Sequence, residues 1–379
     1  MYDGGVRQGM IIQTRYERMV THMKRKRRTI SLLLAAVLAL QCLMLSGCAV
    51  GRDADVHVFY YNYSDTYVTS VRAALDAHLE SNGISYQNYD GNNNQTTQTE
   101  QVKTAITKGA RVILVNLINT GSADAANTVV AAAKGAGIPV IFFNREVPDD
   151  VVKSYEKCAY VGTDAAEAGH LQGEMIGEYL MENFERADLN GDGKISYILF
   201  KGEEGNNEAI FRTRYAVEDA NRILVEAGKP PLSFYDAANA SGYLVDQSGA
   251  WSATAANQYM TTALASHNDA NGNMIELVIC NNDGMAEGAI TALNTVGYNT
   301  GGEKRIPVFG VDATDAARNL IGGGKMAGTI KQDAQGMAQV LAALSENAVG
   351  GKGLLDGTDA YHKDEDVAKI RIPYEKYLG

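Results

Sequence analysis

The sequence predicts an α/β fold of two lobes, each built on a doubly wound parallel sheet. The first observation is length, because 379 residues are too many for one compact core and about right for two domains. The second is an alternation, from Val56 onward, of β-rich apolar runs with amphipathic stretches at helical spacing. The third is composition, because 45% hydrophobic and 21% charged residues exclude collagen-like, disulfide-framework and polytopic membrane classes.

Nine apolar runs qualify as strands, because they are short, rich in β-branched or aromatic residues and bounded by turn residues. They are Val56–Tyr61, Ile84–Tyr89, Val112–Leu117, Pro139–Phe143, Ala159–Gly162, Ile195–Phe200, Leu232–Asp236, Glu276–Asn281 and Pro307–Val311. After the first strand, apolar residues on one helical face predict a helix that ends at Gly83. Helical spacing also predicts helices over residues 97–108, 123–135, 165–183, 207–226, 252–267, 284–297, 313–322 and 334–349. Two sheets of about five strands each account for this count.

The N-terminus has the pattern of an export signal. A basic cluster at Lys24–Arg28 precedes an apolar run over Ile30–Leu45, and small residues follow. This order predicts a signal peptide over residues 1–47 rather than a transmembrane anchor, because the apolar run is short for a membrane span. Cys48 directly follows Ser-Gly and so resembles the lipidated cysteine of bacterial lipoproteins, which would make residues 48–55 a lipidated linker. A signal peptide followed by an accidental cysteine is the alternative.

The mature chain is more acidic than the whole sequence. Removing the signal peptide takes away eight basic and two acidic side chains, so the formal net charge falls from −11 to −17. This charge disfavours nucleic acid as a partner, since a phosphate backbone demands a basic face.

Polar residues gather where the predicted strands end. They are Asp65, Asn116, Asn144-Arg145-Glu146, Asp164, Asn281-Asn282-Asp283 and Asp312. Because Asp and Asn after a strand commonly cap the next helix, each alone has a structural explanation. In open α/β sheets, however, ligands bind at the carboxyl ends of the strands. Six such positions together predict a cleft that binds a polar, hydrogen-bonding ligand.

Five segments in order resemble the periplasmic galactose/glucose-binding proteins of ABC sugar import: IPVIFFNRE, YVGTD, KGEEG, IELVICNNDGMAEGA and IPVFGVDATDAA. The resemblance covers essentially all of Val56 to Tyr377. It implies a type I periplasmic binding protein fold, in which two Rossmann-like lobes are joined by a three-segment hinge and one sugar binds between them. The N-terminal lobe would comprise residues 56–144 and 333–369, and the C-terminal lobe residues 145–332 and 370–379.

The resemblance also implies ten sugar-binding residues, because these positions match the motifs of the family. They are Asp65, Tyr67, Asn116, Asn206, Glu208, Arg212, Trp251, Asn282, Asp312 and Gln332. Hexose hydroxyls both donate and accept hydrogen bonds, which suits carboxylate, amide and guanidinium groups. The apolar C–H faces of the sugar suit aromatic walls such as Tyr67 and Trp251. For Arg212, an exposed position on a helix surface is the alternative.

Three departures from the family pattern leave the identity of the sugar open. Asn206 and Glu208 stand where the family has His and Asp, and Gln332 stands where it has Asn. A one-methylene shift displaces a hydrogen bond, and an unpaired buried polar group costs about 1–3 kcal/mol. D-Galactose, D-glucose and a related hexose or pentose therefore remain alternatives.

A second motif, Asp188–Ser196, resembles the first nine positions of a Ca²⁺ loop, with oxygen ligands at positions 1, 3 and 5 and Gly at position 6. Position 12 is Leu199 within a predicted strand, which excludes an EF-hand because no helix follows to supply a bidentate Glu. In the sugar-binding family the closing Glu comes from a distant strand, and Glu276 matches it. The implied structural Ca²⁺ would be bound by Asp188, Asn190, Asp192, Lys194, Ser196 and Glu276. A solvated Asp/Asn/Gly turn is the alternative.

These features predict an extracytoplasmic lipoprotein, anchored to the cell membrane by its lipid alone, that captures D-galactose or D-glucose and delivers it to the membrane subunits of an ABC permease. The resemblance also implies a monomer. The alternatives are a sensory module that engages a chemoreceptor or signalling partner, and a Ca²⁺-containing hydrolase. An enzyme is not expected, because the six histidines form no HExxH pair or other metal-ligand spacing.

Overall fold

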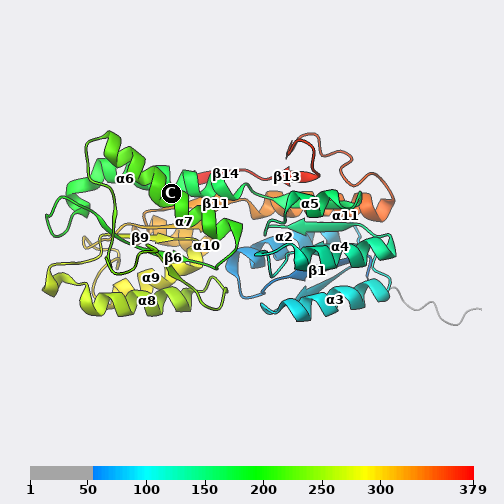
Figure 1. Cartoon of the computed structure of the whole chain (residues 1–379), viewed down its shortest axis with the longest axis horizontal. Coiled ribbons are helices and arrows are strands. Elements are labelled where there is room, and N and C mark those ends of the chain that lie inside the picture. Colours follow the sequence, from blue (N-terminus) through cyan, green and yellow to red (C-terminus); the bar gives the residue numbers. More distant parts are fainter. Residues whose placement is uncertain (1–53) are drawn as a thin grey trace, which may run out of the picture. The chain divides into compact units, whose positions relative to one another are not determined.

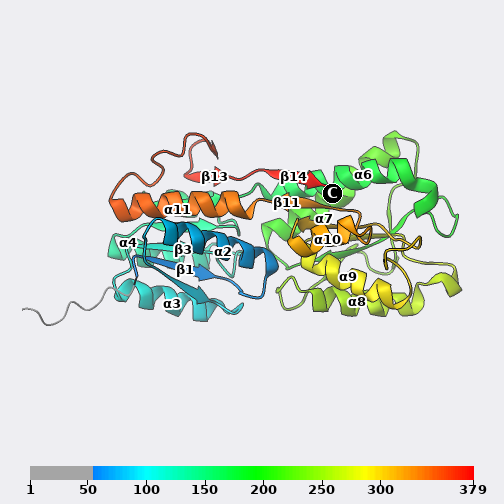
Figure 2. The same cartoon turned by 180° about the vertical axis from the view of Figure 1, so that it is seen from behind.

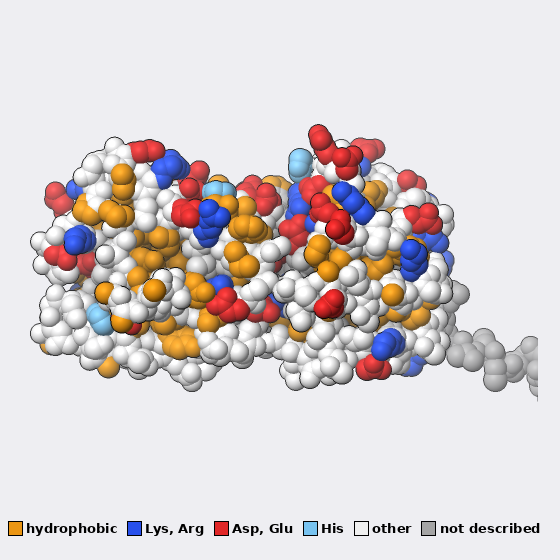
Figure 3. All heavy atoms as spheres, in the orientation of Figure 1, with side chains coloured by type: hydrophobic (Ala, Val, Ile, Leu, Met, Phe, Trp, Pro, Cys, Tyr) orange, Lys and Arg blue, Asp and Glu red, His pale blue; other side chains and the backbone are white. Residues whose placement is uncertain are grey.

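The computed structural model describes residues 54–379, so the predicted signal peptide and the lipidation site Cys48 lie outside the described residues. Within residues 54–379, no helix is both long and apolar enough to cross a membrane. These residues form one compact unit that contains two sheets, each in its own lobe (Figures 1 and 2). On the face drawn in Figure 3, acidic and basic side chains lie among one another in both lobes.

The first lobe is a doubly wound sheet, as predicted, with the strand order β12-β13-β5-β4-β3-β1-β2. Its parallel strands are β1 (Val56–Tyr60), β2 (Tyr86–Asp90), β3 (Val112–Val115), β4 (Val140–Phe143), β5 (Cys158–Gly162) and β13 (Lys369–Arg371). The edge strand β12 (His362–Lys363) is antiparallel to β13. The helices are α2 (Thr66–Ser81), α3 (Gln95–Thr107), α4 (Asp124–Ala136), α5 (Asp149–Lys153) and α11 (Ala334–Gly350).

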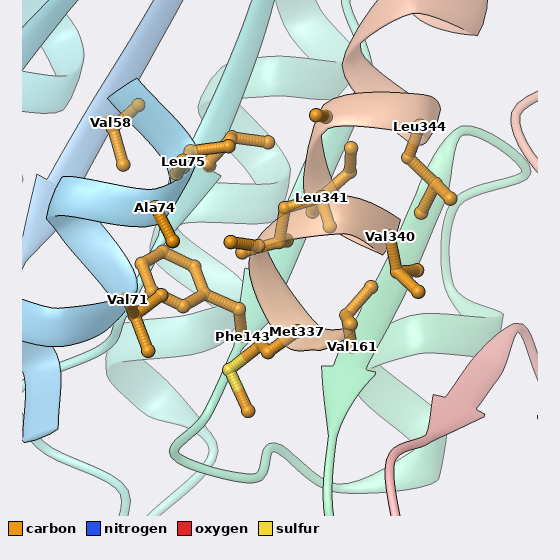
Figure 4. Packing of buried hydrophobic residues seen from close by; sticks show 14 of the residues in the cluster. Val58, Val71, Ala74, Leu75, Phe143, Val161, Met337, Val340, Leu341 and Leu344 are labelled. Atoms are coloured by element: carbon orange, nitrogen blue, oxygen red, sulfur yellow. The ribbon is translucent and has the colours of Figure 1, made fainter. Parts of the chain in front are cut away.

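The core of the first lobe has two layers, because successive residues of a strand point to opposite faces of the sheet. Val58 of β1 lies in the layer under α2 and α11, where Leu75 and Leu341 also pack (Figure 4). Its neighbour Phe59 lies in the other layer, under α3, α4 and α5. Helix α11 follows the second sheet in the chain but packs against α2, so it completes the first lobe.

The second lobe repeats this architecture with the strand order β14-β11-β10-β9-β6-β7, and β8 also pairs with β6. Its strands are β6 (Ser196–Lys201), β7 (Ser233–Phe234), β8 (Leu244–Val245), β9 (Leu277–Cys280), β10 (Val308–Asp312), β11 (Gly328–Gln332) and the antiparallel β14 (Tyr374–Tyr377). The helices are α6 (Ala165–Ala187), α7 (Asn207–Glu226), α8 (Ala253–Ser266), α9 (Asp283–Thr295) and α10 (Asp315–Gly322), with a short 3₁₀ turn at Asp269–Asn271.

Three glycines of α6 set the position of α7. A Cβ atom on Gly169 or Gly173 would lie 2.4 or 2.5 Å from a backbone oxygen of α7, and one on Gly177 would lie 2.7 Å from the Ile223 side chain. These glycines recur every four residues and so form one helical face. The absence of a side chain on this face lets the two helices approach closely, which fixes the helix that carries Glu208 and Arg212.

The chain passes between the two sheets three times, after β5, after β11 and between β13 and β14. The predicted first boundary, after Asn144, is wrong. Strand β5 belongs to the first sheet, because it pairs in parallel with β4 and with β13. The first crossing therefore lies at Thr163–Asp164, and residues 145–162 belong to the first lobe. The last crossing lies at Ile372–Pro373, after β13 rather than at residue 370.

Buried charges hold two of the crossing segments together. Lys369 is 3% exposed, and its Nζ lies 2.7 Å from Glu146 Oε1. Arg371 Nη2 donates to the same oxygen at 2.7 Å and to Asp364 Oδ2 at 2.6 Å. Arg371 Nη1 donates to the carbonyl oxygen of Thr163 at 2.7 Å. The first and third crossings are thus joined through one guanidinium group.

Candidate functional site

A pocket lies between the two lobes, at the carboxyl ends of strands from both sheets. The space between its lining side chains is about 360 Å³, part of which is open to solvent. The lining residues are Tyr61, Asp65, Tyr67, Val68, Asn144, Arg145, Asn206, Glu208, Arg212, Trp251, Asn282, Asp312 and Gln332.

The lobes touch each other around this pocket. Asn93 Nδ2 of the first lobe donates to the carbonyl oxygen of Ser248 in the second lobe at 2.7 Å. Asn206 Nδ2 donates to Thr120 Oγ1 at 3.3 Å. These contacts join loops at the strand ends of both sheets, so the structure represents the closed form of the two-lobed protein.

Nine of the ten predicted sugar-binding residues line the pocket, and Asn116 does not. Asn116 is fully buried behind it and binds three backbone or side-chain groups. Its Oδ1 accepts from the Tyr61 backbone N–H at 3.2 Å, and its Nδ2 donates to Asn144 Oδ1 at 2.9 Å and to the Phe143 carbonyl at 3.1 Å. Asn116 therefore positions residues that line the pocket.

Helix capping and pocket lining coincide at three predicted residues. Asp65 Oδ1 accepts from the Val68 N–H at 2.8 Å at the start of α2. Asn206 and Asn282 cap α7 and α9 in the same way, with Oδ1 accepting backbone N–H groups at 3.0 and 2.9 Å. Each of these three residues therefore caps a helix and also lines the pocket.

Arg212 lies in the floor of the pocket, so the alternative of an exposed position on a helix surface is wrong. Its side chain is 3% exposed. Nη1 donates to the Asn281 carbonyl at 2.9 Å, and Nη2 donates to Tyr374 Oη at 2.8 Å and to Gln332 Oε1 at 3.2 Å. These partners come from β9, β11 and β14, so the whole second sheet holds the guanidinium in place.

Two buried carboxyl groups face this guanidinium. Burial raises the pKa of Asp312 well above its usual range, and Arg212 offsets this only in part. Burial also raises the pKa of Glu208, whose Oε1 accepts from the Glu146 backbone N–H of the first lobe at 3.1 Å. Glu208 Oε2 has no hydrogen-bond partner among residues 54–379, so it is available as an acceptor for a ligand hydroxyl group.

Four buried polar atoms of the pocket residues have no hydrogen-bond partner among the described residues. They are Arg145 Nη1, Glu208 Oε2, Arg212 Nε and Gln332 Nε2. Three of these atoms are donors and one is an acceptor. Because most buried polar groups in native proteins are paired, four unpaired atoms in one pocket indicate that a ligand supplies their partners.

Asp283 supports Asp312 from behind the pocket. Asp283 Oδ1 accepts from Thr329 Oγ1 at 2.6 Å, and Oδ2 accepts from the Thr314 N–H at 2.8 Å. Burial raises the pKa of Asp283 to about 7. These bonds hold the turn after β10, where Asp312 and Ala313 have φ values of 125° and 55° that L-residues rarely adopt. Asp283 thus positions Asp312 at the pocket.

Trp251 forms one wall of the pocket on a strained backbone, with φ of 56°. Its ring packs directly on Gly202, where an added Cβ atom would lie 2.0 Å from the indole Cδ2. The Arg212 guanidinium carbon lies 5.7 Å from the ring centroid. Tyr67 forms another wall and is buried, with its hydroxyl 3.7 Å from Met337 Sδ.

The structure brings Glu276 to the Asp188–Ser196 loop. Glu276 is 1% exposed, and its Oε1 accepts from the Leu189 N–H at 2.9 Å. Its Oε2 accepts from the Ser196 N–H at 2.8 Å. Burial raises the pKa of Glu276. The distant carboxylate that closes the loop is therefore where the resemblance implies.

Within the loop, side-chain oxygens accept backbone N–H groups. Asp188 Oδ1 accepts from Gly191 at 2.8 Å, and Asp188 Oδ2 accepts from Gly193 at 2.9 Å. Asn190 Oδ1 accepts from Asp192 at 2.8 Å. Among residues 54–379, no group of three or more His, Cys, Asp or Glu side chains is arranged to hold a metal. The loop has oxygen donors of the kind that suit Ca²⁺.

The fold and the pocket define a two-lobed receptor that encloses a small polar ligand between its lobes. The chain belongs to the periplasmic binding protein domain family, whose model matches residues 56–353. The predicted fold class and the prediction of a binding protein rather than an enzyme are confirmed by this membership.

Relatives in sequence and structure cover most of the chain. The D-galactose/methyl-galactoside binding periplasmic protein MglB of Haemophilus influenzae is 34% identical over 330 residues, which are 87% of this chain and 91% of that protein. A putative rhizopine-binding protein of Rhizobium meliloti is 28% identical over 315 residues. This match spans 83% of this chain and 86% of that protein. A solute-binding protein from Bacillus halodurans with bound myo-inositol has a TM-score of 0.65 and 25% identity, and covers 86% of this chain and 96% of its own.

Replacing Gly202 by Ala is expected to displace Trp251, because the new methyl group would overlap the indole ring. Overpacking of this kind costs about 1–3 kcal/mol. The expected results are a shifted Trp251 emission maximum and a lower free energy of unfolding in denaturant. The matched control is Gly322→Ala at the end of α10, where an added Cβ meets nothing within 4 Å. An unchanged emission spectrum in Gly202→Ala would contradict the packing described here.

Proposed function

We propose that the protein captures a neutral hexose, D-galactose or D-glucose, between its lobes and delivers it to the membrane subunits of an ABC permease. The single observation that carries this proposal is the set of four unpaired polar atoms in the pocket. Because three are donors and one is an acceptor, the ligand must offer both kinds of group at close spacing. Hydroxyl groups on a ring meet this requirement.

The charges of the pocket favour a neutral ligand. Its ionisable groups are three carboxyl side chains, Asp65, Glu208 and Asp312, and two guanidinium groups, Arg145 and Arg212. A sugar phosphate or uronic acid would add negative charge to a site where burial already raises the pKa of two carboxyl groups. An uncharged polyol avoids this repulsion.

The walls of the pocket suit a pyranose ring. Trp251 and Tyr67 offer flat apolar surfaces to the C–H faces of the sugar, while Glu208 Oε2, Arg212 Nε and Gln332 Nε2 would bond its hydroxyl groups. Relatives of this chain include proteins named as binders of galactose, xylitol and ribose, which also supports a monosaccharide.

The choice between the two hexoses rests on residues that depart from the family pattern. Asn206 uses Oδ1 to cap α7 and Nδ2 to contact Thr120, so both ends of its amide are already engaged. Glu208 keeps Oε2 unpaired and Gln332 keeps Nε2 unpaired. We infer that Glu208 and Gln332, rather than Asn206, distinguish the epimers.

Titration with sugars tests this function directly, because Trp251 is the only tryptophan in the sequence. D-Galactose or D-glucose is expected to change Trp251 fluorescence saturably, with a Kd in the micromolar range or tighter. Galacturonate and hexose phosphates are expected to bind at least 100-fold more weakly, since the desolvation of their charge is not compensated. Calorimetry with Trp251→Phe checks that the fluorescence change reports binding. If neither hexoses nor pentoses change the fluorescence or the melting temperature, the proposal fails.

We also propose that the Asp188–Ser196 loop and Glu276 bind a structural Ca²⁺. The donors would be Asp188, Asn190, Asp192, the Lys194 carbonyl, Ser196 through a water, and Glu276, all hard oxygen ligands of the kind that Ca²⁺ prefers. Support comes from Glu276, a buried carboxyl group that lies against a loop with two further acidic side chains. Such an ion would supply the positive charge that these groups lack.

Removing Ca²⁺ is expected to lower the melting temperature by several degrees. An ion at 100 times its Kd stabilises the folded state by about 2.7 kcal/mol. The measurement is thermal unfolding with a chelator, followed by addition of excess Ca²⁺ to restore the transition. Glu276→Gln is expected to lose the effect, whereas Asp359→Asn, at an exposed side chain that pairs with Lys363, is expected to keep it. A wild-type protein whose unfolding is unaffected by the chelator would refute the site.

A lipid on Cys48 is the proposed means of membrane attachment. The support is the export signal that precedes it in the sequence. When the full chain is produced in a bacterial host, the protein is expected to partition into the detergent phase, and Cys48→Ser is expected to move it to the aqueous phase. Cys42→Ser, within the signal, serves as the control and is expected to leave partitioning unchanged. Detergent partitioning of Cys48→Ser would exclude this anchor.

A further inference from the structure

Arg145 lines the pocket on a rigid backbone, and it is not one of the ten residues that the family resemblance places on the sugar. It follows β4 and is 4% exposed. Asn144 before it adopts a left-handed conformation, with φ of 61°, and its Oδ1 accepts from Asn116 Nδ2 at 2.9 Å. The Arg145 N–H donates to the Phe143 carbonyl at 2.8 Å. The tight turn that this bond closes directs the Arg145 side chain into the pocket.

The guanidinium of Arg145 contacts both lobes. Its Nη2 forms an ion pair with Glu203 Oε2, which follows β6 in the second lobe. The guanidinium carbon Cζ of Arg145 lies 4.5 Å from the ring centroid of Tyr61 in the first lobe. Its Nη1 is buried without a hydrogen-bond partner among the described residues. The protein therefore fixes the guanidinium through Nη2 and through its contact with the Tyr61 ring. Nη1, in contrast, has no acceptor among the described residues.

Arg145 also joins two residues that the family resemblance places on the sugar. Tyr61 Oη donates to Asp65 Oδ2 at 2.5 Å, and Trp251 Nε1 donates to Glu203 Oε2 at 3.4 Å. The resulting chain of contacts runs from Asp65 through Tyr61, Arg145 and Glu203 to Trp251. It crosses from the first lobe to the second, so it is complete only when the lobes are closed.

We propose that Arg145 is a further specificity-determining residue, whose Nη1 donates a hydrogen bond to one hydroxyl of the bound hexose while Glu203 of the opposite lobe fixes the guanidinium. The inference rests on the proposed function and adds a residue to it. Arg145 donates to that hydroxyl only in the closed form, since Glu203 pairs with Arg145 only when the lobes are closed. A sugar that lacks this hydroxyl, or carries it with the other configuration, leaves a buried charged donor unpaired.

The ion pair alone does not favour closure. Burial raises the pKa of Glu203, and Arg145 and Trp251 offset this only in part. Taking both charges out of water is costly unless further hydrogen bonds complete their surroundings. The sugar hydroxyl provides the missing bond on Nη1, which couples closure of this part of the cleft to the presence of the ligand.

The test compares Arg145→Met with the wild-type protein over the bound hexose and its 2-, 3-, 4- and 6-deoxy analogues. Hydrogen bonds to charged groups contribute enough that Arg145→Met is expected to weaken the parent hexose about 10- to 100-fold. For one deoxy analogue the same substitution is expected to change the Kd less than about 3-fold, because the contact is already absent. Arg214→Met, at an exposed α7 residue paired with Glu218, is the matched control and is expected to change no Kd.

Two further variants separate specificity from structure. Arg145→Lys keeps the charge but not the fork of donors, so it is expected to show the same pattern over the analogues with a smaller loss. It also serves if Arg145→Met does not fold. Glu203→Gln is expected to increase the dissociation rate of the parent hexose while leaving the melting temperature of the ligand-free protein within about 2 °C.

If substitution of Arg145 weakens the binding of the parent hexose and of every analogue by the same factor, Arg145 contacts none of these hydroxyl groups. The inference is then overturned while the proposed function stands. If the wild-type protein binds no hexose at all, the proposed function and this inference fail together. Selective loss at one deoxy position is the result that supports Arg145 as a reader of that hydroxyl.

Discussion

The rest of the structure depends on the burial of polar atoms that the described residues leave without a hydrogen-bond partner. Arg145 Nη1, Glu208 Oε2, Arg212 Nε and Gln332 Nε2 are enclosed when the lobes meet. An unpaired buried polar group costs about 1–3 kcal/mol, so closing the empty protein carries a penalty comparable with the free energy of binding a small ligand. A ligand that pairs these atoms removes the penalty. Closure is thereby made to depend on occupancy, which a receptor that hands its cargo to another protein requires.

The hinge and the pocket meet at one residue. The Glu146 side chain binds Lys369 and Arg371 at the crossing segments, while its backbone N–H donates to Glu208 Oε1 in the pocket. Glu208 belongs to the second lobe, where the glycine face of α6 fixes its helix. A separation of the lobes breaks the bond to Glu208 but leaves the charged cluster intact, because its members belong to the first lobe and its crossing strands. The cluster therefore holds the hinge together while the pocket opens.

The sequence was sufficient for the parts of the molecule with strong local patterns. Long buried strands and amphipathic helices were predicted close to their observed bounds, and the helix over residues 207–226 agrees at both ends. Strands of two residues, such as β8 and β12, are too short to show a period, so about five strands were predicted where each sheet has seven. The first boundary was wrong although both β4 and β5 were predicted as strands, because it was taken from the resemblance and not from strand pairing, which no local pattern encodes. Arg145 was predicted only as one of several polar residues at strand ends, because its pairing with Glu203 lies across the cleft and no local pattern encodes it. Tyr61 was missed as a pocket residue.

The pocket residues fall into two groups that contribute differently to selectivity. Asp65, Asn206 and Asn282 cap helices, so each side chain is already fixed by a backbone N–H of its own lobe. These residues provide a rigid polar frame at helix N-termini, where the local field favours electron-rich oxygens. The second group consists of the four residues with unpaired atoms, and none of them caps a helix. Their fixed atoms are held partly by distant strands or by the opposite lobe, as Glu208 is by Glu146. Because a cap residue loses little when a hydroxyl is absent, whereas an unpaired buried atom loses its only partner, we infer that discrimination between sugars depends on the second group.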